Sequence, residues 1–162
     1  MTPKNRALLA ARVARAAWPA LAVQGYVSPI DVLIGLGWLD MGRVERWRRG
    51  QIPYLERVVE ANLPRISEAM KAFRSWAAER ELKASETAYL RRAPPRRPLV
   101  FSRSGRPEIE KLYRTHWVAP QLSEKKRERL LEKERLTATL HERMAEGNEG
   151  EQAAAFIVGS KD

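Results

Sequence analysis

The chain has 162 residues, of which 30 are Lys or Arg and 20 are Asp or Glu, giving a formal net charge of +10. It contains no cysteine, which excludes disulfides, thiolate zinc sites and cysteine nucleophiles. No stretch approaches the run of about 18 apolar residues that a transmembrane helix needs, so we expect a basic, cytoplasmic protein with no membrane partner.

The excess positive charge is unevenly placed. The net charge is +4 over residues 1–30, +1 over 31–90, +6 over 91–120 and −1 over 121–162. Arginines outnumber lysines by 22 to 8, and the planar guanidinium suits phosphates and guanine edges. A GC-rich coding sequence would explain the arginine excess equally well, but not its clustering. We therefore expect nucleic acid as the partner.

The hydrophobic pattern predicts a mainly α fold. The expected fold is a small helical domain with a helix-turn-helix-like hairpin, an Arg/Pro-rich extended segment and a long charged C-terminal helix. Its parts are a basic helical arm (1–23), a helical core (24–90), a basic segment ending in a short helix (91–120), the charged helix (121–146) and a disordered tail (147–162).

The first predicted helix begins at Thr2-Pro3, where a hydroxyl cap precedes a proline at the first helical position. It is expected to end at Trp18, because Pro19 follows. The stretch bears arginines and no acids, which is also typical of transit peptides. We favour an arm that packs on the core.

Two short helices follow. Ser28 can cap a helix over Pro29–Leu36, which Gly37 would end. Asp40 can cap a second helix over Met41–Arg49. Helical spacing places three apolar residues of the second helix toward the core: Met41, Val44 and Trp47. It places Gly42, Arg46 and Arg49 outward, flanked by Arg43 and Glu45.

The sequence Val44-Glu45-Arg46-Trp47-Arg48-Arg49-Gly50 resembles the recognition helix of bacterial helix-turn-helix transcription factors. The resemblance spans residues 29–50, with a turn one residue longer than is usual. It implies that Arg43, Arg46 and Arg49 face base edges or phosphates in a DNA groove. The alternative is a plain helical hairpin with a solvated basic face.

Apolar residues keep helical spacing from about Pro53 to Leu82, and Pro64 either kinks one helix or starts a second. The core is expected from residues 30–39, Val44, Trp47 and the span 55–76. The five tryptophans are expected to pack in the core rather than to stack on bases.

Beyond this helix, residues 85–90 form either a helical turn or a short extended piece. The Arg/Pro-rich stretch that follows cannot be helical. It carries six arginines and no acid: Arg91, Arg92, Arg96, Arg97, Arg103 and Arg106. Arginines on an extended backbone can follow phosphates or enter a minor groove, although a flexible linker would have the same composition. Within the stretch, Leu99–Phe101 is either a short strand or an apolar plug.

A helix is predicted from Pro107 to about Trp117, with Ile109, Leu112, Tyr113 and Trp117 toward the core. His116 on it, with Glu108, Tyr113 and Arg114 nearby, could belong to a nuclease or phosphotransfer site. It has no second metal ligand at suitable spacing, so we favour a packing role. No nucleophile, base and acid occur together, and no phosphate-binding glycine loop is present. We therefore expect no enzyme activity, no metal and no cofactor.

The charged helix over residues 124–144 has a thin apolar stripe, which is typical of a solvent-exposed or partner-binding helix. It could support a homo-oligomer or bind a protein partner. The favoured function is DNA binding through the helix-turn-helix-like element and the arginine-rich segment. The alternatives are an RNA- or ribonucleoprotein-binding protein and a helical interaction adaptor.

Overall fold

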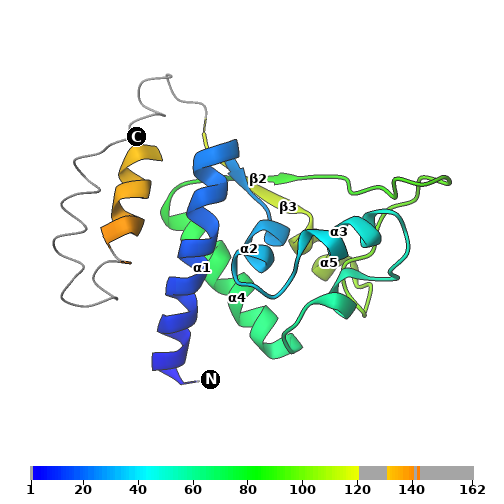
Figure 1. Ribbon diagram of the computed structural model, residues 1–162, viewed down its shortest axis with the longest axis horizontal. Coiled ribbons are helices and arrows are strands. Elements are labelled where there is room, and N and C mark those ends of the chain that lie inside the picture. The colour runs from blue at the N-terminus through cyan, green and yellow to red at the C-terminus, as the bar shows by residue number, and fades with distance from the viewer. Residues whose placement is uncertain (1, 121–130, 141, 143–162) are drawn as a thin grey trace.

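A computed structural model describes residues 2–120, 131–140 and 142. These residues form a mainly helical fold with a small antiparallel sheet (Figure 1). The helices are α1 (Pro3–Gln24), α2 (Pro29–Gly35), α3 (Met41–Arg48), the 3-10 helix η1 (Leu55–Val58), α4 (Leu63–Glu79) and α5 (Pro107–Tyr113). The strands are β1 (Tyr26–Val27), β2 (Lys83–Glu86) and β3 (Thr115–Val118). No helix among the described residues is long and apolar enough to cross a membrane.

Helix α1 runs through Pro19 to Gln24, so the prediction that it ends at Trp18 is wrong. Pro19 lies on the exposed side of the helix, where water can satisfy the carbonyl that the proline leaves without a donor. The helix ends at Gly25, which adopts a left-handed conformation with φ 80°. Its buried stripe has four-residue spacing: Leu9, Val13, Ala17 and Leu21.

Helices α1, α2 and α4 pack against one another and hold most of the core. The α1–α2 contact is close at Gly35, where an added Cβ would lie 2.5 Å from the Cβ of Ala16. The capping box predicted for α2 is present, because Ser28 and Asp31 exchange hydrogen bonds between side chain and backbone. The first of the two predicted short helices therefore begins at the predicted residue, Pro29.

The sheet has the order β1-β3-β2, and both pairs are antiparallel. No sheet was predicted. Leu99–Phe101, for which a short strand was one alternative, is not a strand, whereas β2 includes the first two residues of the span 85–90, for which a short extended piece was one alternative. The helix expected to reach Trp117 ends at Tyr113, and residues 115–118 form the central strand instead. This run contains Thr, His, Trp and Val, and β-branched and aromatic residues of this kind favour a strand.

The proline at position 64 starts a second helix rather than kinking one long helix. Asn62 caps α4 by accepting a hydrogen bond from the Arg65 N–H at 2.9 Å, and Pro64 occupies the first turn. The preceding residues form only the short helix η1. The predicted helical span 53–82 is therefore divided before Pro64, where the sequence had allowed either one kinked helix or two helices.

The core prediction for the tryptophans is confirmed: Trp38, Trp47 and Trp76 are buried, and Trp18 and Trp117 pack partly buried against the core. Three apolar residues expected in the core are instead exposed: Met41 by 56%, Leu63 by 54% and Leu112 by 42%. Phe101 is fully buried and Leu99 packs partly buried against the core, so these two residues form the apolar plug, while Val100 between them is 40% exposed.

Residues 131–140 are helical, in agreement with part of the predicted charged helix. They pack beside α1 (Figure 1), and Glu134 forms an ion pair with Arg80 at 2.6 Å. Ala138 is buried and Leu131 packs against the core. This part of the helix thus contacts its own chain rather than standing exposed. Residues 121–130, 141 and 143–146, and the tail predicted over 147–162, lie outside the described residues.

Candidate nucleic-acid interface

Helix α3 exposes a basic side and buries an apolar one. Asp40 caps it by accepting a hydrogen bond from the Arg43 N–H at 2.9 Å. Val44 and Trp47 are buried, whereas Arg46 and Arg49 are exposed. The helical period therefore turns these two arginines toward solvent while the buried pair holds the helix in place.

Trp47 fixes α3 to the plug at residues 99–101. Its indole Nε1 donates a hydrogen bond to the Val100 carbonyl at 2.8 Å. Its ring lies 4.8 Å from the Phe101 ring and 6.0 Å from the Tyr89 ring, between ring centroids. Helix α3 packs mainly against η1, whereas α2 packs mainly against α1. The brace behind α3 is therefore the plug and η1 more than α2.

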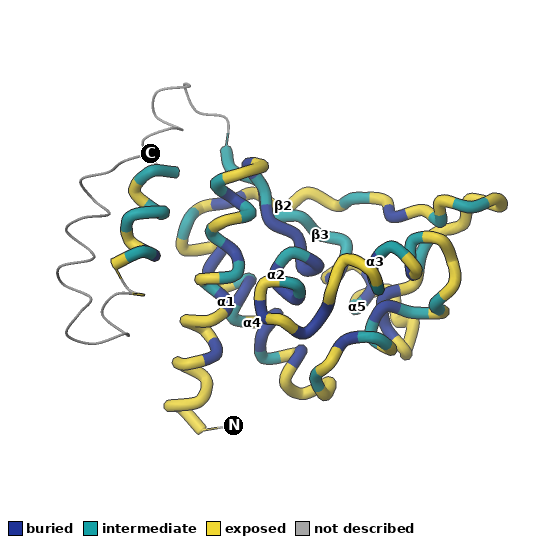
Figure 2. The backbone as a smooth tube through the Cα atoms, in the orientation of Figure 1, coloured by how far each residue is buried: buried dark blue, intermediate teal, exposed yellow. Residues whose placement is uncertain are grey.

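The segment 89–99 doubles back on itself and forms a projecting arm, here called the basic arm. Leu99 N donates to the Tyr89 carbonyl at 2.8 Å, and Arg91 N donates to the Arg97 carbonyl at 2.8 Å. The arm extends away from the helical body (Figure 1), and most of it is exposed (Figure 2). Its turn holds the Arg-Pro residues 91–98, which the sequence predicted to be extended or turning.

The basic arm lies directly against α3. Arg92 N donates to the Arg48 carbonyl at 2.8 Å, and the Arg92 guanidinium pairs with Glu45 at 2.8 Å. Arg91 packs on Gly50, where any Cβ would collide with the guanidinium. Arg48 lies over the Tyr89 ring, 5.0 Å from its centroid. Two arginine clusters that are more than forty residues apart in sequence thus form one surface.

Four arginines of this surface have no hydrogen bond or ion pair from their side chains within the described residues: Arg46, Arg49, Arg96 and Arg97. Arg91 has its Nε buried without a hydrogen-bond partner in the same part of the chain. Glu45 is the carboxylate paired within the surface. The surface consequently carries an excess of positive charge that the described residues do not neutralise.

The other predicted arginines lie elsewhere. Arg43 is held by ion pairs with Asp40 and Glu60, and the hydrogen bond that it donates to Glu60 raises the pKa of Arg43 above its usual value. Arg103 and Arg106 lie in the wall of a cleft beside α4, described below. The sequence therefore placed nine arginines in one candidate site. The structure places Arg91 and Arg92 against α3, which carries Arg46 and Arg49, while Arg96 and Arg97 follow on the projecting part of the arm.

Arg48 was not among the predicted site residues, although it belongs to the same surface. Its carbonyl anchors the arm, and its guanidinium covers Tyr89. Burial raises the pKa of Tyr89 to about 12, so this phenol stays protonated at neutral pH. An adjacent pair of arginines, Arg48 and Arg49, is the signal that could have drawn attention to it.

His116 belongs to an aromatic cluster behind the arm. Its Nε2 lies 2.6 Å from the Tyr89 hydroxyl, and its ring stacks on Tyr26 with centroids 5.0 Å apart. Burial lowers the pKa of His116. The described residues contain no group of three or more His, Cys, Asp or Glu side chains that could hold a metal ion. These contacts give His116 a packing role.

No protein-family model, no characterised protein and no solved structure matches this chain.

Proposed function

We propose that the chain binds duplex nucleic acid, and DNA in preference to RNA, through α3 and the basic arm. The observation that supports this proposal is the close contact between the two arginine clusters, made by Arg92 with the Arg48 carbonyl and with Glu45. Like charges held together repel one another unless an anion is near. A phosphate backbone supplies anions at a spacing that one extended surface can meet.

The two parts of the surface suit different contacts. Arg46 and Arg49 stand on the exposed side of a short helix, which is narrow enough to enter a major groove and to offer guanidinium forks to base edges. Arg96 and Arg97 stand on an exposed, extended arm, which suits the phosphate backbone or a minor groove. The resemblance of residues 29–50 to a helix-turn-helix bears on α3 alone, and α2 packs mainly against α1 rather than behind α3.

The test is a binding titration of the full chain with fluorescent random-sequence duplex DNA and with structured RNA, each over a series of salt concentrations. Each neutralised phosphate contributes about 0.9 to the slope of log K against log salt. We expect R96A/R97A to reduce that slope by about 1.8, since two phosphate contacts are lost. R46A/R49A should weaken binding by about 1–3 kcal/mol for each base contact, with a smaller change of slope.

The matched control is R6A/R15A, which removes the same charge from the exposed part of α1. It should change the affinity much less than either pair on the proposed surface. Binding that does not depend on salt, or that falls equally in all three variants, would contradict the proposal. Tighter binding of RNA than of duplex DNA at equal salt would favour the ribonucleoprotein alternative.

A further inference from the structure

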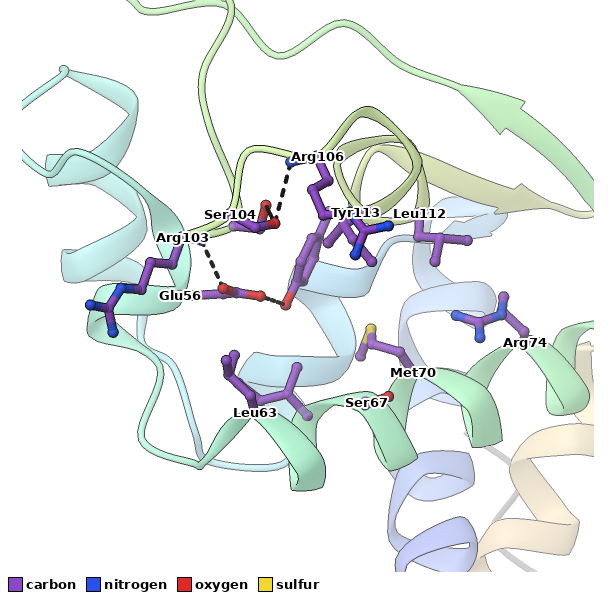
Figure 3. Close-up of a pocket in the computed structure, with 13 residues that line it drawn as sticks. Glu56, Leu63, Ser67, Met70, Arg74, Arg103, Ser104, Arg106, Leu112 and Tyr113 are labelled. Carbon is purple, nitrogen blue, oxygen red and sulfur yellow. Dashed lines mark hydrogen bonds between the residues drawn. The ribbon is translucent and has the colours of Figure 1, made fainter.

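We propose that a cleft beside α4 binds a small amphipathic anion, a molecule with a carboxylate or phosphate head and an apolar body. The cleft lies between η1, α4 and the segment that leads into α5, and its volume is about 590 Å³ (Figure 3). This size falls in the range of about 300–1,000 Å³ that is usual for small-molecule sites. Its lining combines an apolar surface with arginines, and each part is considered in turn.

The apolar surface comes from both walls. Leu63, Ile66 and Met70 line it from α4, and Ile109 and Leu112 line it from α5. Leu63 is 54% exposed and Leu112 is 42% exposed, although both face a hollow rather than a flat surface. An apolar ligand would remove this area from water, which is favourable by about 25 cal/mol per Å². The exposure of Leu112, which the sequence did not predict, thus provides apolar surface for a ligand in the cleft.

The charged part of the lining lies on one side. Figure 3 shows Arg74 extending from α4 and Arg106 from the opposite wall, on the same side as Leu112, while the Arg103 side chain points away. Within the described residues, the Arg74 side chain has no hydrogen-bond or ion-pair partner. Arg106 pairs with Glu108 at 2.6 Å, but both groups are exposed, so a ligand anion can compete with this pair.

The carboxylate in the lining, Glu56, keeps its negative charge, but its two oxygens accept hydrogen bonds within the wall. Glu56 accepts a hydrogen bond from the Tyr113 hydroxyl at 2.6 Å and from the Arg103 N–H at 2.9 Å. Burial, reinforced by Glu56, raises the pKa of Tyr113, so its hydroxyl remains a donor to Glu56. The cleft therefore presents cations to a ligand and keeps its acid occupied within the wall.

The wall that carries Arg106 is held in place from behind. Glu110, which is buried, accepts hydrogen bonds from the backbone N–H groups of Phe101 and Ser102, at 2.9 and 2.7 Å, and from the Ser102 hydroxyl. Ser102 Oγ in turn accepts from Gly105 N at 3.0 Å. A loop fixed in this way loses little conformational entropy when a ligand binds.

The cleft does not use the arginines of the proposed nucleic-acid surface: Arg46, Arg49, Arg91, Arg92, Arg96 and Arg97 are absent from its lining. The two proposals therefore fail or succeed independently. A ligand that binds the cleft in a chain that does not bind DNA would leave this inference intact.

The experiment is a titration of the full chain, labelled with ¹³C at the methionine methyl groups, with octanoate and with 1-octanol. Met70 lines the cleft, whereas Met41 is exposed on α3 outside it and serves as an internal control. We expect octanoate to shift the Met70 methyl signal saturably, to leave Met41 unchanged and to bind about tenfold tighter than the uncharged alcohol.

R74Q/R106Q should weaken octanoate binding about tenfold and leave octanol binding unchanged. R103Q is the matched control from the same loop, and its octanoate affinity should stay within about twofold of the parent. The inference is overturned if Met70 does not respond, if Met41 shifts with it, or if octanoate and octanol bind equally well. It is also overturned if R103Q weakens binding as much as R74Q/R106Q does.

Discussion

Glu110 is the buried acid on which the loop before α5 depends. It accepts hydrogen bonds from two backbone N–H groups and one hydroxyl. A buried donor left without a partner costs about 1–3 kcal/mol. We expect Glu110→Ala to lower the free energy of unfolding by about 2–4 kcal/mol, as measured by urea denaturation.

The control is Glu108→Ala, two residues earlier on the same helix. Its carboxylate is 57% exposed and pairs with an exposed arginine, so its loss should cost less than about 1 kcal/mol. Equal effects of the two substitutions would show that the loop does not depend on the buried carboxylate.

His116 gives a stability that depends on pH. Burial lowers its pKa, so the folded chain binds a proton there less tightly than the unfolded chain, whose histidine has the ordinary value of 6.5. The free energy of unfolding should therefore fall as the pH drops through 6.5 toward the lower folded value, and this contribution should be fully present above 6.5.

The measurement compares urea denaturation at pH 7.5 and 5.5 for the parent and for His116→Gln, which cannot be protonated but can still bond to Tyr89. The loss of stability between the two pH values should be smaller in the variant. Asp31, which opposes the shift, and Arg48, which adds to it, are present in both chains. An identical loss in both would place the titration elsewhere.

At the scale of elements, the contact between α1 and α2 limits residue size at Gly35. An added Cβ would lie 2.5 Å from the Cβ and 2.9 Å from the Cα of Ala16, so the helices would have to separate. Gly35→Ala should lower the free energy of unfolding by about 1–3 kcal/mol, despite the higher helix propensity of alanine. Thermal and urea unfolding measure this change.

Gly42→Ala provides the comparison, because Gly42 is also helical and an added Cβ there meets only the exposed Asp40 side chain, at 3.2 Å. Its effect on the free energy of unfolding should stay within about 1 kcal/mol. If Gly35→Ala is equally mild, α1 and α2 do not pack as closely as described.

At the scale of the whole molecule, the described part of the C-terminal helix is held against the body by the Arg80–Glu134 ion pair, whose side chains are 31% and 16% exposed. The Arg80 guanidinium also lies 4.5 Å from the Trp76 ring centroid. A double-mutant cycle with Arg80→Ala and Glu134→Ala should give a coupling energy of about 0.5–1 kcal/mol in urea denaturation.

The control cycle combines Arg135→Ala with Arg80→Ala. Two cations do not form an ion pair with each other, so their coupling energy should be near zero or slightly repulsive. A coupling energy of zero for Arg80 with Glu134 would show that this ion pair does not stabilise the contact of residues 131–140 with the body.

Local signals were sufficient for the helix starts. The capping residues Thr2, Ser28 and Asp40 act within three residues of themselves, and Gly37 and Gly50 take the left-handed conformation that ends or follows a helix. The buried stripe of α1 and the burial of Trp47 follow from the helical period in the same way. Such features depend on neighbours along the chain, so the sequence alone determined them, together with the mainly α class and the uneven charge.

The sheet, the basic surface and the cleft were decided by contacts between distant residues. Strands of two to four residues carry too little periodicity to be recognised, and β3 becomes a strand because two partners flank it. The basic arm contacts α3 through the hydrogen bond from Arg92 N to the Arg48 carbonyl. The ion pair with Glu60 removes Arg43 from the basic surface. Charge and apolarity could be read from the sequence, but which side chains share a surface depends on how the chain folds back on itself.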